Sequence, residues 1–139
     1  MNPRDERGSV SIWLALASLV MMLAVGLAVD LGGQVHAQQQ AHDLAAQAAR
    51  AGGEQLQAAP AIQGTGATID PTAAIAAANS YLSAAGVTGT VTVTGPDTIT
   101  VTVHTSYTPT FLTAIGINHL TVTGTATAHL IRSLGGQPR

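Results

Sequence analysis

The fold is decided by residues 8–29, GSVSIWLALASLVMMLAVGLAV, a run of 22 residues without a charge between Arg7 and Asp30. The run contains Trp13, five leucines, four valines and two methionines. At about 1.5 Å of rise per residue, a helix of this length extends about 33 Å. A bilayer core is about 30 Å thick, so the sequence predicts a transmembrane helix over residues 9–30.

The few cations of the chain predict the orientation of this helix. Arg4 and Arg7 precede the apolar run, and the next cation is Arg50. Because cytoplasmic flanks carry the excess of arginine, residues 1–8 are expected in the cytoplasm and everything after Asp30 outside it. The sequence therefore predicts a single-pass protein of the cell membrane with an extracytoplasmic C-terminal domain.

A cleavable secretory signal is the alternative interpretation of the same stretch. A short basic segment precedes it, and Val35-His36-Ala37 resembles a cleavage site with small residues. The apolar run is longer than the usual signal core of about 7–15 residues, which favours a retained anchor. The alternative product is a secreted, cell-wall-associated adhesive or binding domain.

Length and composition limit what else the chain contains. Its 139 residues leave room for one anchor and one small domain. Only 9% of residues are charged, the net charge is −2, and lysine is absent. Nucleic-acid binding needs a clustered basic surface, so nucleic acid is not an expected partner. The absence of cysteine excludes disulfides and thiol chemistry.

An alanine-rich helix is expected outside the membrane over residues 31–59, with a bend or fray near Gly32-Gly33. Small residues recur at helical spacing in both helical stretches, and such ridges let a second helix approach closely. They define a predicted helix-packing interface: Ala24, Ala28 and Gly32 at the membrane, then Ala37, Ala41, Leu44 and Ala48 outside it. For the outer ridge the packing partner is either another subunit or the chain's own sheet. Alanine is also the best helix former, which explains the same spacing without a partner.

Residues 60–69 are expected to form a linker and residues 70–132 a small α+β domain. Asp70 and Pro71 mark a helix start, and Gly86 is placed to end that helix. Threonine then alternates with branched apolar residues over 90–94 and 98–103, which predicts a β-hairpin around Gly95-Pro96-Asp97, with the apolar side chains inward. Residues 109–118 are expected to be irregular or to form a single helical turn. Residues 120–130 are expected to form a third strand, in which Gly124 marks a bulge or a close approach. Residues 133–139 are expected to form a loose tail.

The predicted fold class is therefore α+β: a long N-terminal transmembrane helix that continues outside the membrane, then one helix packed on a three-stranded antiparallel sheet. A domain of this size rarely gains more than a few kcal/mol from its own core. It is expected to gain support from the outer helix, another copy or a homologous subunit.

The side chains needed for catalysis or metal binding are scarce. Past Glu54 the only acids are Asp70 and Asp97, which serve as a helix cap and in a turn. His36 and His42 are six residues apart and point in different directions on a helix. His104 and His129 could meet across the sheet, but the sequence offers no third ligand to complete a metal site with them. We therefore expect that the protein is not an enzyme, and that it binds no metal, no other cofactor and no small-molecule substrate. The outward threonines fit β propensity, and they could also carry sugars or form an assembly surface.

Several segments resemble the TadE/TadG-like group of tight-adherence (Flp-type) pilus-assembly proteins. They are Arg7-Gly8-Ser9 before the apolar run, GLAVDLG at 26–32 and AHDLAAQAARAG at 41–52. The strand LTVTGTATA at 120–128 is similar to short actinobacterial members. The resemblance implies a membrane-anchored minor pilin, pseudopilin or assembly factor of a Tad apparatus. Its expected partners are the lipid membrane and other TadE/TadG-like subunits or the secretion platform, with self-assembly as a further option.

One position departs from the TadE-type pattern. In TadE-type pseudopilins, a prepilin peptidase reads a glycine that is followed five residues later by glutamate. Gly8 stands at the glycine position, but Trp13 occupies the place of the glutamate. The resemblance therefore implies the TadG-like side of the group, which keeps its anchor, with processing after Gly8 as the alternative.

Overall fold

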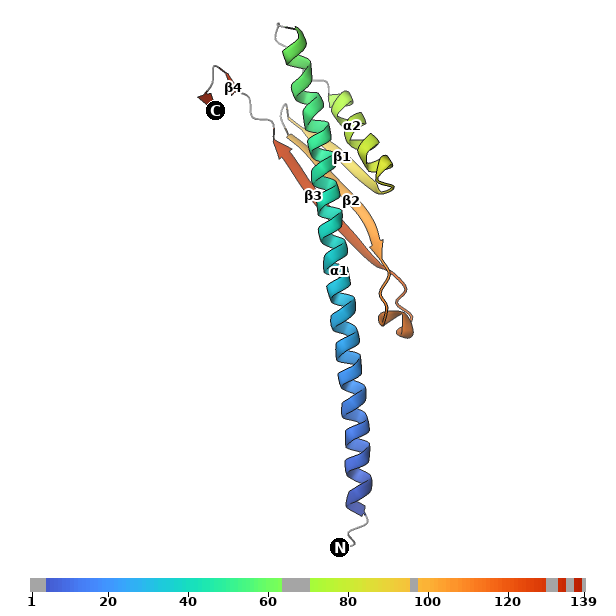
Figure 1. Cartoon of the computed structure of the whole chain (residues 1–139). Helices are drawn as coiled ribbons and strands as arrows, with labels where there is room; N and C mark the ends of the chain where they lie inside the picture. Colours follow the sequence, from blue (N-terminus) through green and yellow to red (C-terminus); the bar gives the residue numbers. More distant parts are fainter. Residues whose placement is uncertain (1–4, 64–70, 96–97, 130–132, 135–136, 139) are drawn as a thin grey trace. The chain divides into compact units, whose positions relative to one another are not determined.

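The structure is a computed structural model, and it describes residues 5–63, 71–95, 98–129, 133–134 and 137–138. The elements in chain order are α1 (Asp5–Gln63), α2 (Pro71–Ala84), β1 (Thr88–Thr94), β2 (Thr98–Tyr107), the 3₁₀ helix η1 (Leu112–Ile115), β3 (Leu120–His129), β4 (Ser133–Leu134) and β5 (Gln137–Pro138) (Figure 1). The predicted α+β class, with one long apolar helix, a second helix and a three-stranded antiparallel sheet, is confirmed.

Helix α1 is longer and more regular than the sequence suggests. It is assigned as one α-helix of 59 residues that passes through Gly32-Gly33 without interruption. It also ends at Gln63, beyond the expected linker start at residue 60, and so includes Pro60. Gly32 and Gly33 each cost about 1 kcal/mol relative to alanine in a helix interior, and the alanine-rich sequence that follows keeps the cost of the other positions low.

Tertiary contacts divide the chain into two compact units. The first unit comprises Met1–Val35 together with Tyr107–Leu120, and the second comprises His36–Ser106 together with Thr121–Arg139. The segment between β2 and β3 thus belongs with the N-terminal half of α1, a grouping that the linear order of the sequence does not suggest.

The three-stranded sheet of the second unit has the order β1-β2-β3. Strands β1 and β2 are antiparallel, with Val91 opposite Val101 and Gly89 opposite Val103. Side-chain hydrogen bonds join Thr100 to Thr127 at 3.1 Å and Thr102 to Thr125 at 3.2 Å, which fixes an antiparallel register between β2 and β3. Threonines therefore share one face, and the buried Ile99, Val101, Val103 and Val122 lie on the other.

Both helices cover the apolar face of this sheet, and glycines allow their close approach. A Cβ added at Gly124 of β3 would collide with the backbone of Ala41 in α1. At Gly89 of β1 an added Cβ would lie 2.9 Å from the Leu82 side chain of α2. Gly124 was expected to mark a bulge or a close approach, and the structure shows the close approach.

Helix α2 begins and ends where its sequence predicts. Pro71 occupies the first helical position, and Gly86 ends the helix with φ +69°. The Gly86 N–H donates to Ser83 O and the Val87 N–H to Leu82 O, both at 3.1 Å, as in a Schellman motif. Asp70 and Asp97, with their expected roles, and residue 130, the expected end of the third strand, lie outside the described residues. Within the expected tail, β4 pairs with β5.

Candidate functional site

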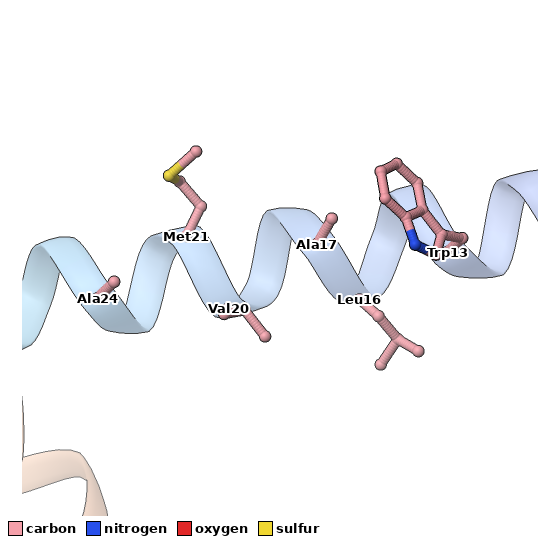
Figure 2. Close-up of a pocket in the computed structure, with 6 residues that line it drawn as sticks. All are labelled: Trp13, Leu16, Ala17, Val20, Met21 and Ala24. Carbon is pink, nitrogen blue, oxygen red and sulfur yellow. The ribbon is translucent and has the colours of Figure 1, made fainter.

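The N-terminal half of α1 presents large apolar side chains to its surroundings on all sides. Trp13 is 69% exposed, Met21 68% and Leu23 61%. Figure 2 shows Trp13, Ala17 and Met21 on one side of the helix, with Leu16 and Val20 pointing elsewhere. Among the described residues, α1 is the one helix long and apolar enough to cross a membrane. A surface of this kind is unfavourable in water and suits lipid or another apolar helix.

One face of this helix holds a buried carboxylate, that of Asp30. Its Oδ1 accepts the backbone N–H of Thr110 at 2.7 Å, and its Oδ2 accepts those of Phe111 at 2.9 Å and Leu112 at 2.7 Å. The residue is fully buried. Three N–H groups at the start of η1 lack helical partners, and an anionic oxygen satisfies them well. We call Asp30 and residues 107–120 the Asp30 clasp.

Two glycines of α1 make room for the clasp. A Cβ added at Gly26 would lie 2.8 Å from the Phe111 ring, and one added at Gly33 would overlap the ring of Tyr107. Gly26, Asp30 and Gly33 follow a 4-3 spacing, so they lie on one helical face. Sequence reasoning missed this site because it treated Asp30 only as the end of the apolar run. A lone acid directly after that run was the available signal.

The predicted membrane-proximal ridge lies on the opposite face of α1. At about 100° per residue, Gly26, Asp30 and Gly33 lie roughly 180–240° around the helix from Ala24, whereas Ala28 and Gly32 lie within about 80° of it. The structure leaves Ala24, Ala28 and Gly32 exposed, and nothing lies within 4 Å of a Cβ added at Gly32. The clasp therefore leaves this ridge open.

The predicted outer ridge lies in the second unit. Ala41 and Ala48 are buried, and Ala37 and Leu44 are half-buried. Gly52, one turn after Ala48, shows what covers this part of α1. A Cβ added at Gly52 would lie 2.5 Å from the Ile99 side chain of β2 and 2.9 Å from the Ala74 carbonyl oxygen of α2. Of the two partners that the sequence left open, this part of the helix contacts the chain's own sheet and α2.

The histidines take part in separate local contacts. His129 Nδ1 lies 3.2 Å from Thr98 Oγ1, and His42 Nδ1 lies 2.8 Å from the Thr125 carbonyl oxygen. His104 pairs with Thr88 in the β1–β2 register, six residues along β2 from Thr98. The idea that His104 and His129 meet across the sheet is therefore wrong. No group of three or more potential metal ligands occurs among the residues that the structure describes.

The positions singled out for N-terminal processing lie inside helix α1. Gly8 and Trp13 are helical, and so is the candidate signal-cleavage stretch Val35–Ala37.

Comparison with known proteins links part of the chain to a protein family. No curated protein and no solved structure matches the chain. The family model Tad, described as Flp pilus-assembly TadE/G-like, matches residues 8–59. This range contains the exposed apolar helix, the open small-residue ridge and Asp30. The family supports a structural role in pilus assembly, in contact with other pilus components. Residues 8–59 are therefore similar to the TadE/G-like Flp pilus-assembly family.

Proposed function

We propose that this chain is a single-pass, membrane-anchored, non-enzymatic component of a Tad (Flp-type) pilus or secretion apparatus, acting as a minor pilin, pseudopilin or assembly factor. Residues 9–30 form its anchor, the N-terminus lies in the cytoplasm, and the sheet domain lies outside. The anchor is retained, because Trp13 replaces the glutamate expected after Gly8. The partners are lipid and other TadE/TadG-like subunits or the secretion platform.

The exposed apolar surface of α1 is the observation that carries this proposal. From Val10 to Val29 the large apolar side chains of the helix are between 46% and 69% exposed. Burial of one such side chain typically contributes about 1.5–3 kcal/mol, so a helix bearing many of them strongly favours lipid over water. Arg4 and Arg7 before the run favour a cytoplasmic N-terminus.

The open ridge at Ala24, Ala28 and Gly32 supports a role in assembly. Small side chains at four-residue spacing let the backbones of two membrane helices approach closely. Because the Asp30 clasp covers the opposite face, the chain's own segment 107–120 does not occupy this ridge. We therefore assign the ridge to a helix of another pilus subunit.

Membrane anchoring is tested with the full chain expressed in a host that carries a Tad apparatus. The protein should remain in the membrane pellet after alkaline extraction and dissolve only in detergent. Its intact mass should match the unprocessed sequence. Recovery in the soluble fraction, or a mass that begins after residue 37, would contradict the anchor and favour a secreted domain.

Assembly through the ridge is tested with a matched pair of variants. Ala28→Leu fills the ridge, whereas Ala15→Leu makes the same change on the opposite face, about 180° from Ala24. Both residues are exposed in the structure. Cross-linking and co-purification of other pilus subunits should fall with Ala28→Leu and stay unchanged with Ala15→Leu. Equal recovery with both variants would contradict a role for this face.

A further inference from the structure

The segment between β2 and β3 presents an apolar surface beside the anchor helix. Residues 107–120 read YTPTFLTAIGINHL and contain no Asp, Glu, Lys or Arg. Ile115 is 69% exposed, Phe111 43% and Ile117 38%. These three are the large hydrophobic residues with high exposure among the described residues outside α1. An apolar surface on an uncharged segment needs a partner that is itself apolar.

Contacts inside the first unit set the level of this segment along α1. Phe111 packs at Gly26, which lies within the uncharged run of residues 8–29, and Tyr107 packs at Gly33. Gly33 lies 20 residues after Trp13, which is about 30 Å along a helix and equals the thickness of a bilayer core. Trp13 and Tyr107 thus lie at the two levels where membrane proteins carry their aromatic belts.

Several backbone N–H groups of the segment have hydrogen-bond acceptors within the protein and do not need water. Asp30 accepts the N–H groups of Thr110, Phe111 and Leu112. The N–H of Ala114 donates to Phe111 O and that of Gly116 to Thr113 O, each at 3.1 Å. Unsatisfied N–H groups are what normally keep irregular backbone away from lipid. The same contacts bury the Asp30 carboxylate, the one acid between Arg7 and Asp43.

We propose that residues 107–120 form a second membrane contact, in which Phe111, Ile115 and Ile117 enter the outer boundary between lipid headgroups and acyl chains beside the end of the anchor. The inference rests on the proposed membrane anchor and adds a contact that the anchor alone does not supply. The partner is the lipid surface, since the apolar side chains continue the surface of α1 at its outer end. Interfacial segments typically enter about 5–10 Å, which suits one 3₁₀ turn.

The absence of cysteine allows a direct test by single labels. Ile115→Cys, Val20→Cys and Ser80→Cys each place a thiol at an exposed position, in the clasp, in the anchor and on α2 respectively. Each full-length variant is labelled with an environment-sensitive fluorophore and reconstituted into vesicles of phosphatidylcholine and phosphatidylglycerol. Quenching is measured with aqueous iodide, with a nitroxide near the lipid headgroup and with a nitroxide deep in the acyl chain.

The label at Ile115 should be quenched best by the shallow nitroxide, and iodide should quench it roughly threefold less than the label at Ser80. The label at Val20 should be quenched best by the deep nitroxide. If Val20 is protected but Ile115 is as open to iodide as Ser80, the second contact is wrong and the anchor stands. If Val20 is also open to iodide, both the contact and the anchor are wrong.

Discussion

The Asp30 carboxylate accepts the backbone N–H of Leu112 at 2.7 Å, although 82 residues separate the two in the sequence. The same oxygen accepts the N–H of Phe111, and the other oxygen accepts that of Thr110. One acid in α1 thereby fixes the start of η1. These three hydrogen bonds join the segment 107–120 to α1 within the first unit.

Asp30→Asn should release the clasp. The amide keeps one acceptor oxygen but turns an NH₂ group toward N–H donors, which leaves them unsatisfied. We expect the free energy of opening the segment 107–120 away from α1 to fall by about 2–4 kcal/mol. Hydrogen bonds to charged acceptors contribute about 1.5–3 kcal/mol each, and these contributions are not additive. Hydrogen exchange at the amides of Thr110, Phe111 and Leu112 should accelerate in detergent micelles. The exposed Asp43 supplies the control, and Asp43→Asn should leave exchange at these amides as it is.

Gly32→Ala and Gly33→Ala should have opposite effects although the residues are neighbours. A methyl group at Gly32 meets open space, whereas one at Gly33 meets the ring of Tyr107. Alanine stabilises a helix interior by about 1 kcal/mol relative to glycine, so Gly32→Ala should raise the unfolding temperature. Gly33→Ala should expose Tyr107, which its fluorescence and limited proteolysis within residues 107–120 would report. Equal behaviour of the two variants would contradict the packing of Tyr107 on α1.

Gly124→Ala should destabilise the second unit. The new methyl group would collide with the Ala41 backbone, which cannot move without shifting α1 from the sheet. Overpacking of this kind typically costs about 1–3 kcal/mol. Gly53→Ala is the matched control, because its methyl group meets nothing within 4 Å. Thermal unfolding followed by circular dichroism should show a lower midpoint for Gly124→Ala only.

The hydrogen bond from Tyr81 Oη to Gln47 Oε1, at 2.5 Å, links α2 to α1. Its strength is measurable by a double-mutant cycle with Tyr81→Phe and Gln47→Ala. We expect a coupling free energy of about 0.5–1.5 kcal/mol, as for a neutral hydrogen bond. A coupling of zero would show that the two helices are held by apolar packing alone.

The periodic features of the fold could be predicted from the sequence. Alternating threonine and valine predicts the strands, Gly86 the end of α2, and the apolar run the long helix. The division into units could not be predicted, because it depends on contacts between distant segments. Asp30 and Thr110 each have ordinary local roles in the sequence, and their relationship appears only when the chain is folded.

The candidate site could be predicted in part for the same reason. The small-residue ridge follows from helical spacing, and the structure leaves its N-terminal part, Ala24, Ala28 and Gly32, exposed. Which partner covers Ala41 and Ala48 was left open, because a small-residue face fits a sheet as well as another helix. The glycines at 26, 33, 52 and 124 show their role only beside the atoms that approach them.

The long sequence separation within the clasp has a consequence for biosynthesis. A ribosome adds about 5–20 residues per second, so Leu112 is made about 4–16 seconds after Asp30. During that interval the carboxylate lacks its three backbone donors. Water must solvate it until the later segment arrives, and the order of synthesis makes closure of the clasp a late step of maturation.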